Sequence, residues 1–103
     1  MAELKKTFSD EEIEHLASKF KILSEPSRLK ILRSLFTGEK CVSEIIEITG
    51  LLQANVSKQL KILQKHGIVD SRAQGLQRYY QLIDFTVLSI CNVLCVDSNH
   101  LQN

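Results

Sequence analysis

The sequence lacks a long hydrophobic run, although 44% of its 103 residues are hydrophobic. A membrane-spanning helix needs roughly 18 or more consecutive apolar residues, and no stretch approaches that length. The beginning of the chain, MAELKKTFSDEE, also lacks the apolar core of a secretory signal peptide. We therefore expect a cytoplasmic protein that makes no contact with a membrane.

Cysteine is scarce and odd in number, with three in the chain. An odd count without an export signal does not favour a disulfide framework, and thiols that stay reduced are available for metal binding or redox chemistry.

The sequence also lacks internal repeats, low-complexity segments and interdomain linkers. A chain of this length can bury one compact core. We therefore predict a single domain over residues 1–103, with flexible tails at 1–9 and 97–103.

The usual signatures of an enzyme are missing as well. The sequence shows no pairing of a nucleophile with a base and no phosphate-binding glycine loop. It also shows no pair of carboxylates with a cleft that they would serve. The prediction from these absences is a protein that is not an enzyme.

The net charge is only +1, but the charges are distributed unevenly along the chain. Residues 1–25 hold six acids against four lysines, whereas residues 51–82 hold five basic residues and a single acid, Asp70. A basic segment on a nearly neutral protein is the pattern expected of a surface that meets phosphate groups. The charge pattern alone leaves a second interpretation open, namely a merely solvated face.

The first half of the chain predicts three helices. Apolar residues at helical spacing indicate the first helix over residues 10–23. Ser24 as a capping group and Pro26 in the first turn indicate that a second helix follows directly. A short third helix is predicted over residues 43–49, with Ser43 as its N-cap.

A basic helix and a hairpin follow. The apolar residues of QANVSKQLKILQKHG fall on one face, which places a lysine stripe on the opposite face, because a helix advances about 100° per residue. The stripe consists of Ala54, Lys58, Lys61 and Lys65 and contains no acid. The next stretch, IVDSRAQGLQRYYQLI, changes to the pattern of a β-hairpin with its turn at Gly75.

The last apolar segment, Phe85 to Val96, has no fixed polar face. A helix that is apolar nearly all round must be buried on more than one side, and a domain this small has only one core to offer. We expect a partner subunit to provide the second burial, which predicts a homodimer.

A short helix, a tight turn, a basic helix and a hairpin, in this order, are the layout of a winged helix-turn-helix. We therefore predict a mainly α fold of about five helices with a small β-hairpin wing, in which the second helix of the pair enters the major groove of double-stranded DNA. The side chains predicted to contact base edges or phosphates are Gln53, Asn55, Ser57, Lys58, Gln59, Lys61, Arg72, Gln77 and Arg78. Because the same geometry occurs in domains that bind only protein, an interaction module without DNA binding remains an alternative.

Four blocks of the sequence resemble, in order, the ArsR/SmtB family of metal-responsive and thiol-responsive repressors. The blocks are LSEPSRLKILRSL, GEKCVSEI, GLLQANVSKQLKIL and GLQRYYQL, and the resemblance covers about residues 13–96. It implies a two-fold dimer formed by the first and last helices. It also implies a palindromic DNA operator that is released when an inducer occupies a sensing site.

The sequence departs from this family where the inducer would bind. The positions that match the family's zinc site on the last helix are Asp84, Thr86, Asp97 and His100. Threonine and aspartate replace two histidines there, so we do not expect that zinc site. The family's arsenite and cadmium sensors often carry a second cysteine two residues after the first, but Ser43 follows Cys41 at that spacing. Residues 1–20 contain no cysteine that would complete a site with Cys41.

Two cysteines remain, and they are four residues apart. In a helix Cys91 and Cys95 lie on one face with roughly 5–6 Å between their β-carbons, close enough for both sulfurs to hold one soft ion. A disulfide suits this spacing less well, because it prefers β-carbons near roughly 3.8 Å. The alternative interpretation is that both cysteines fill the core as small hydrophobes. Cys41 precedes the positive end of a helix, where a thiol pKa can be depressed, and it is a candidate third ligand.

The predicted function is that of a dimeric DNA-binding repressor that releases its operator when cysteine thiols bind a thiophilic metal or metalloid. The predicted metal-site residues are Cys91 and Cys95, with Cys41 as a further candidate. Inducers of matching chemistry are arsenite, antimonite and cadmium, and none of them is needed for folding. The alternative within the same fold is a repressor whose thiols respond to an oxidant or a persulfide.

Overall fold

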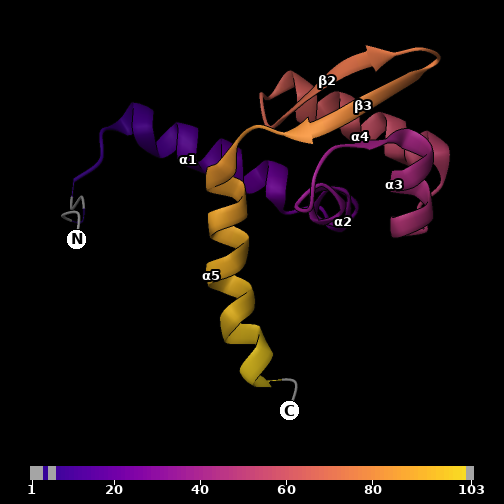
Figure 1. The fold of residues 1–103 in the computed structure, drawn as a ribbon. Helices are drawn as coiled ribbons and strands as arrows, with labels where there is room; N and C mark the ends of the chain where they lie inside the picture. Colours follow the sequence, from indigo (N-terminus) through magenta and orange to yellow (C-terminus); the bar gives the residue numbers. More distant parts are fainter. Residues whose placement is uncertain (1–3, 5–6, 102–103) are drawn as a thin grey trace.

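The computed structural model describes residue 4 and residues 7–101, with side chains placed as far as residue 95. The elements are α1 (Asp10–Leu23), α2 (Pro26–Ser34), β1 (Lys40–Cys41), α3 (Val42–Thr49), α4 (Gln53–Lys65), β2 (Val69–Gln74), β3 (Gln77–Leu82) and α5 (Phe85–Leu101). In Figure 1, α2, α3 and α4 gather beside the strands, while α1 and α5 run outward from this body. The predicted mainly α fold with five helices and a hairpin wing is confirmed.

A capping box fixes the beginning of α1. The backbone N–H of Glu12 donates to Ser9 Oγ at 3.1 Å, and the backbone N–H of Ser9 donates to the Glu12 carboxylate at 3.0 Å. Each bond satisfies a backbone donor that has no partner inside the helix, and a cap of this kind stabilises a helix by about 1 kcal/mol. The predicted bounds of this helix, 10–23, are confirmed.

The predicted caps of the next two helices are wrong by one or two residues. The N-cap of α2 is Glu25 and not Ser24, because the Glu25 carboxylate accepts a hydrogen bond from the backbone N–H of Arg28 at 3.2 Å. The N-cap of α3 is Cys41, whose backbone N–H donates to Glu44 Oε1 at 2.9 Å. In both cases an ionised carboxylate, which is a stronger acceptor than a serine hydroxyl, decides the boundary.

The turn between α3 and α4 depends on Gly50. Its φ of 72° lies in the left-handed region, and its backbone N–H donates to the carbonyl of Ile46 at 2.8 Å. Glycine adopts this conformation without a steric cost, which ends α3 and reverses the chain within a few residues. Leu52 then serves as the N-cap of α4 without a capping side chain and is 80% exposed.

The hydrophobic core lies where α2, α3 and α4 meet the sheet and the start of α5. Its fully buried side chains are Ile31, Leu32, Ile45, Val56, Leu60, Leu63, Ile68, Val69 and Val87. Three of them come from the apolar face of α4, as its spacing predicts. Because this face of α4 is buried in the core, the opposite, polar face points toward solvent.

The three strands form one antiparallel sheet in the order β1-β3-β2. β2 and β3 pair from Val69↔Leu82 to Gln74↔Gln77, and the two residues between them make the turn of the predicted hairpin. β1 was not predicted, because it is only two residues long and exists through its pairing with Tyr79 and Tyr80 of β3. It connects the segment before α3 to the middle of β3.

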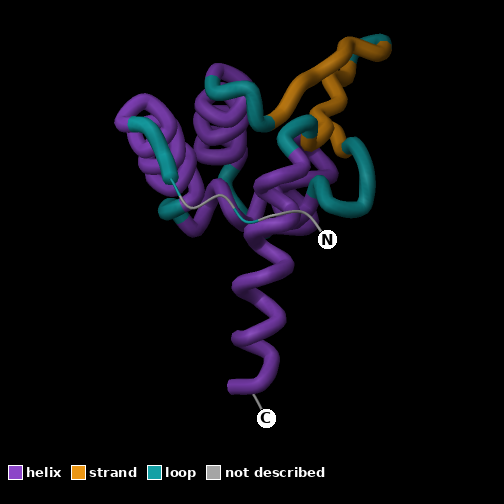
Figure 2. The backbone as a smooth tube through the Cα atoms, turned by 90° about the vertical axis from the view of Figure 1, so that its left-hand side faces the viewer, coloured by secondary structure: helices purple, strands orange, loops and turns teal. Residues whose placement is uncertain are grey.

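α1 and α5 extend beyond the packed body (Figures 1 and 2). The radius of gyration is 15.4 Å, whereas a compact chain of this length has a value of about 13 Å. α5 continues to Leu101, past the predicted end at Val96. The outer part of the predicted tails, at 1–3, 5–6 and 102–103, lies outside the described residues. Among the described helices, none has the length and apolar character to cross a membrane.

Candidate nucleic-acid interface and cysteine pocket

The outward face of α4 is a basic surface. Lys58, Lys61 and Lys65 are exposed, and they line a shallow groove of about 550 Å³ together with Ala54, Ser57 and Ile62. No acid occurs in α4, so no carboxylate of this helix neutralises the lysines. Gln53 and Ser57 are exposed on the first turns of the same helix. This surface offers ammonium groups and neutral hydrogen-bonding groups to a polyanion.

Gln59 does not belong to that surface, which corrects its prediction as a DNA contact. Its side chain is 5% exposed, accepts a hydrogen bond from Arg28 Nη1 at 3.0 Å, and donates to Asn55 Oδ1 at 2.9 Å. Asn55 in turn donates to Ser27 Oγ at 3.2 Å. The spacing that puts Asn55 and Gln59 one turn apart is that of a helix face, and this face points toward α2 rather than solvent.

Arg28 is the centre of this network and carries a role that the sequence did not reveal. Besides its bond to Gln59, its Nε donates to the carbonyl of Ile22 at 2.6 Å. One guanidinium therefore connects the end of α1, the start of α2 and the middle of α4. We use the name α2–α4 network for Ser27, Arg28, Asn55 and Gln59. An arginine in an amphipathic helix gives no sign in sequence that its partners lie on another helix.

The arginines of the wing are engaged with neighbouring side chains. Arg72 forms an ion pair with Glu39, donates to Gln74 Oε1 at 2.6 Å, and lies 5.1 Å from the centre of the Tyr79 ring. The hydrogen bond and charge of Arg72 hold the pKa of Glu39 below its ordinary value. Arg78 donates to Ser71 Oγ at 3.0 Å. Both arginines remain exposed, as does Gln77.

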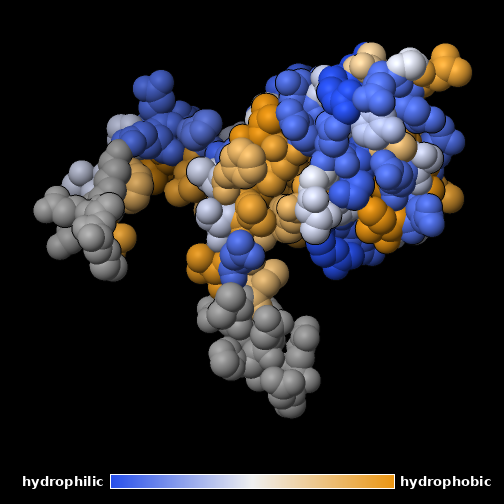
Figure 3. Space-filling view, viewed as in Figure 1, coloured by the Kyte–Doolittle hydropathy of each residue, from blue (hydrophilic) through white to orange (hydrophobic). Residues whose placement is uncertain are grey.

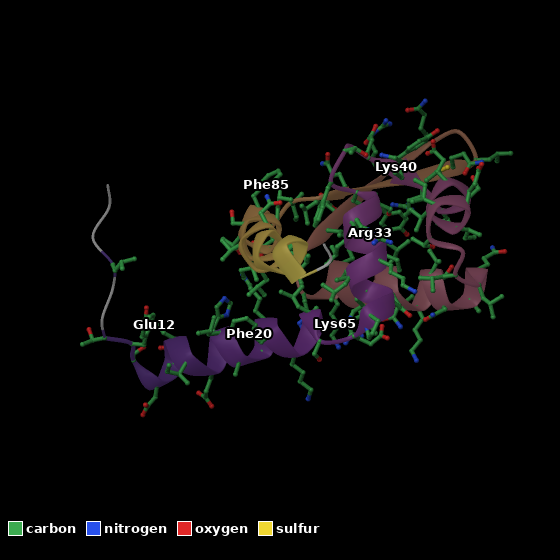
Figure 4. The ribbon with its side chains drawn as sticks, turned by 90° about the horizontal axis from the view of Figure 1, so that it is seen from below. Glu12, Phe20, Arg33, Lys40, Lys65 and Phe85 are labelled. Atoms are coloured by element: carbon green, nitrogen blue, oxygen red, sulfur yellow. The ribbon has the colours of Figure 1, made fainter. Side chains whose placement is uncertain are left out.

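Cys91 and Cys95 lie on one face of α5 and line a pocket against α2. The pocket has a volume of about 200 Å³, and its other lining residues are Leu29, Lys30, Arg33 and Phe36. Cys91 is half-buried and packs against the core, while Cys95 is exposed. Burial, and then the neighbouring Cys95, raises the pKa of the Cys91 thiol. Figure 4 shows this side of the molecule, with α5 seen end-on beside α2 and Arg33 labelled.

Cys41 does not join this pair, which corrects its prediction as a third ligand. It is 5% exposed at the start of α3, and its Sγ lies 3.2 Å from Ser43 Oγ. Among the described residues, no cluster of three or more His, Cys, Asp or Glu side chains has the geometry to hold a metal ion. The β1–β3 pairing places Cys41 beside Tyr79, in the middle of β3 and on a different element from the cysteine pocket.

The first turn of α5 is tied to α1. Lys19 Nζ lies 2.8 Å from Asp84 Oδ2 and donates to Thr86 Oγ1 at 3.2 Å. Burial by itself raises the pKa of Asp84, but the hydrogen bonds and charge of Lys19 and Thr86 outweigh it, so this pKa lies below its usual value. Asp84 and Thr86 are two of the positions that match the family's zinc site, and here they hold a lysine. The other two positions, Asp97 and His100, lie beyond the described side chains.

Apolar side chains gather on the exposed sides of α1 and α5 (Figure 3). They include Ile13, Phe20 and Phe85, which are 47%, 49% and 65% exposed, and Val93, which is 67% exposed. A groove of about 570 Å³ runs between the two helices, lined by Phe8, Leu16, Thr86, Ile90 and their neighbours. Exposed apolar surface on two helices that extend from the body is typical of a protein-protein interface.

Comparison with known proteins connects these features to one family. The family model described as "Bacterial regulatory protein, arsR family" matches residues 25–71. The chain is 36% identical to the uncharacterized HTH-type transcriptional regulator MJ1325 of Methanocaldococcus jannaschii, over 82% of this chain and 96% of that protein.

Two solved structures are similar over nearly the whole chain. The AntR antimony-specific transcriptional repressor is 26% identical with a TM-score of 0.85, and the match covers 96% of this chain and 91% of that one. The homodimeric winged helix-turn-helix domain of a possible ArsR-family regulator from Mycobacterium bovis is 30% identical with a TM-score of 0.75, over 92% of each chain. The fold, the sequence blocks and these relatives together show that the chain belongs to the ArsR family of bacterial transcriptional regulators.

Proposed function

We propose that this protein is a homodimeric transcriptional repressor that binds a palindromic DNA operator through α4 and the β2–β3 hairpin. It releases the operator when Cys91 and Cys95 bind a thiophilic metal or metalloid. The observation that carries the proposal is the lysine face of α4, which is exposed on the second helix of a helix-turn-helix. That helix is the one that such folds place in the major groove.

The exposed residues of α4 have different roles in this interface. Lys58 and Lys61 contact phosphates, because ammonium groups on the groove-facing surface release counterions when they meet the DNA backbone. Gln53 and Ser57, on the first turns, are positioned to contact base edges. The wing contributes through Gln77 and Arg78, which occupy exposed positions at the start of β3. Gln59 contacts no base and instead positions α4 through its hydrogen bond with Arg28 of α2.

The dimer supplies the symmetry that a palindromic operator requires. The apolar sides of α1 and α5 remain exposed in the single chain, and the related domain from Mycobacterium bovis is described as homodimeric. Pairing of α1 and α5 with their counterparts would remove this surface from water. Two copies of α4 related by a two-fold axis then read two half-sites one helical turn apart.

The cysteine pocket supplies the inducer site. Two thiols on one face of α5 select soft ions and metalloids, and a structurally similar repressor is antimony-specific. The wall opposite the thiols is α2, and α2 also bears the arginine of the α2–α4 network. A ligand that changes the packing of α5 on α2 therefore acts on the helix that holds α4. If the ligand binds better to the conformation of low DNA affinity, linkage requires that it displace the operator.

The test is fluorescence anisotropy of the reduced protein on a labelled palindrome from its own promoter. Arsenite, antimonite, cadmium, zinc and a persulfide donor are titrated in turn. We expect release by a soft ion or metalloid under strictly reducing conditions. We also expect Cys91→Ser and Cys95→Ser to bind the operator normally and to resist release, while Cys41→Ser behaves like the wild type.

Three results would contradict the proposal in different ways. Binding to the palindrome no tighter than to random DNA, and unaffected by Lys58→Gln, would indicate a protein-interaction module instead of a repressor. Full release of both single cysteine variants by the same ion would remove the pocket from the sensing mechanism. Release by the persulfide donor alone would replace metal sensing with thiol oxidation.

A further inference from the structure

Leu52 is an exposed apolar side chain at the beginning of α4. It is 80% exposed, whereas the side chain of the preceding residue, Leu51, packs against the core. Figure 1 shows α3, and with it the turn that leads into α4, at the end of the body away from α1 and α5. Leu52 is therefore separate from the apolar surface of α1 and α5 that we assign to the dimer.

The backbone holds Leu52 in one place. Its carbonyl accepts a hydrogen bond from the backbone N–H of Val56 at 3.0 Å, inside the first turn of α4. On the other side, the backbone N–H of Leu51 donates to Thr49 Oγ1 at 3.3 Å, and Gly50 reverses the chain with its left-handed φ of 72°. Bonds on both sides of Leu52 therefore fix the point at which its side chain leaves the fold.

Leucine is a poor choice for the stability of this position. The N-cap of a helix favours serine, threonine, aspartate or asparagine, whose side chains accept a hydrogen bond from the first turn, and leucine is among the weakest caps. Leu52 makes no such hydrogen bond. At 80% exposure it also buries little apolar surface. An apolar group that stabilises neither the helix end nor the core is suited to a contact with a molecule outside the chain.

The neighbours of Leu52 indicate what that molecule presents. The next residue, Gln53, is exposed, and a glutamine amide can pair with N6 and N7 of adenine in the major groove. The other exposed side chains of the first two turns are small, polar or basic: Ala54, Ser57 and Lys58. This end of α4 is the one that a helix-turn-helix directs at base edges. The methyl group that a base presents in the major groove is the C5-methyl of thymine.

Resting on the proposed repressor function, we infer that Leu52 recognises a thymine of the operator by packing against its C5-methyl group in the major groove, beside the base pair that Gln53 contacts. The contact removes two apolar groups from water together, so it stabilises the complex only where the methyl group is present. It therefore adds sequence discrimination rather than general affinity for DNA. Lysines that meet phosphates do not supply this discrimination, because every sequence carries the same phosphates.

The experiment removes the methyl group from one operator position at a time. Deoxyuridine replaces thymidine symmetrically in both half-sites, which keeps every base pair and deletes only the methyl group. Binding of each duplex to the full-length reduced protein is measured by fluorescence anisotropy at one fixed salt concentration. We expect a thymine position at which the replacement weakens binding about fourfold per half-site, or about fifteenfold for both half-sites, as burial of one methyl group predicts.

Matched variants assign the effect to Leu52. Leu52→Ala should lose most of the difference between thymine and uracil at that position, so the changes in protein and DNA are not additive. Alanine and leucine are both poor caps, and truncation of an exposed side chain leaves no cavity, so the fold tolerates this change. Leu76→Ala shortens a fully exposed leucine on the turn between β2 and β3 and should keep the full sensitivity. Leu52→Ser adds a capping hydroxyl and should raise Tm by about 4–8 °C while it loses the same discrimination.

The outcomes separate this inference from the proposed function. Tight binding to the palindrome without a sensitive thymine, or a sensitivity that Leu52→Ala retains in full, would overturn the thymine contact and leave the repressor function in place. A Leu52→Ser variant that melts below the wild type would indicate that leucine stabilises the fold, which would remove the basis of the inference. Binding to the palindrome no tighter than to random DNA would contradict the proposed function itself, and the inference with it.

Discussion

Replacement of Arg28 with methionine tests whether the α2–α4 network holds α4 in place. The change removes two hydrogen bonds that a charged donor makes, at 2.6 Å to the carbonyl of Ile22 and at 3.0 Å to Gln59 Oε1. Gln59 is 5% exposed, so water does not readily replace the lost donor. A hydrogen bond to a charged group contributes about 1.5–3 kcal/mol, and a buried acceptor without a partner costs about 1–3 kcal/mol.

We expect Arg28→Met to lower the free energy of unfolding by about 2–4 kcal/mol, since the guanidinium is only half-buried and methionine retains part of its packing. For a domain near 100 residues, each kcal/mol shifts Tm by about 4–8 °C, so the variant should melt about 8–32 °C lower. Urea unfolding and thermal melting by circular dichroism measure both quantities. Protein concentration is held constant, because dimerisation makes Tm depend on it. Arg33→Met, at an exposed position of the same helix, is the control and should change stability by less than about 0.5 kcal/mol.

The double variant Arg28→Met with Gln59→Met gives the sharper result. Because each single change leaves the other partner without its bond, the combined loss should be smaller than the sum of the single losses by about 1 kcal/mol or more. Strict additivity, or an Arg28→Met variant as stable as the wild type, would refute the reasoning. Gln59→Met should also leave the ranking of operator sequences unchanged, whereas loss of a base contact would reduce discrimination by about 1–3 kcal/mol at one base pair.

Three further predictions concern the proposed DNA interface, the α1–α5 contact and the proposed dimer. Lys58→Gln and Lys61→Gln should each weaken binding to all DNA sequences alike and lower the slope of log K against log salt by about 0.9 per site, whereas an unchanged slope would place that lysine away from phosphate. Asp84→Asn removes the ion pair with Lys19. The pKa of Asp84 in the folded protein lies below its ordinary value of 3.8. The ionised carboxylate therefore stabilises the fold above pH 3.8, and this stabilisation is lost as the pH falls through the lower pKa of the folded state. The stability difference between wild type and Asp84→Asn, about 1 kcal/mol or less at pH 7, should therefore shrink between pH 5 and pH 3 in urea titrations, and a constant difference would contradict the assignment. Val93→Glu places a charge on the apolar side of α5 and should shift the protein from dimer to monomer in sedimentation velocity, while an unchanged dimer would exclude this side of α5 from the interface.

Local signals in the sequence were sufficient for most of the fold. The bounds of α1, the hairpin turn after Gln74 and the apolar face of α4 follow from spacing, turn residues and periodicity. The caps of α2 and α3 were misplaced because serine is a common capping residue, while the competing acceptors, Glu25 and Glu44, become visible only when the backbone geometry is known. β1 was missed because two residues carry no periodicity.

The residues of the candidate site could be predicted where the pattern of a single helix determines which of its side chains are exposed. The lysine stripe of α4 is such a case, since Val56, Leu60 and Leu63 mark the opposite face as the buried one. Gln59 was assigned to the same surface because a polar residue next to lysines in a basic helix is usually exposed. Its burial depends on Arg28, which lies 31 residues earlier in the chain. A hydrogen bond between residues so far apart in the chain cannot be predicted from the local sequence around either one.

Residue types and their spacing were sufficient to indicate the family, the order of the elements, the lysine face of α4 and the position of Cys91 and Cys95 on one face of α5. These features depend on residue type and on spacing within one element, where backbone geometry is known in advance. Only the packing of separate elements shows that Gln59 faces α2, that Cys41 stands apart from the other thiols, and that α2 forms the wall of their pocket. Those facts depend on how separate elements pack, and packing is set by contacts between residues that are distant in the chain.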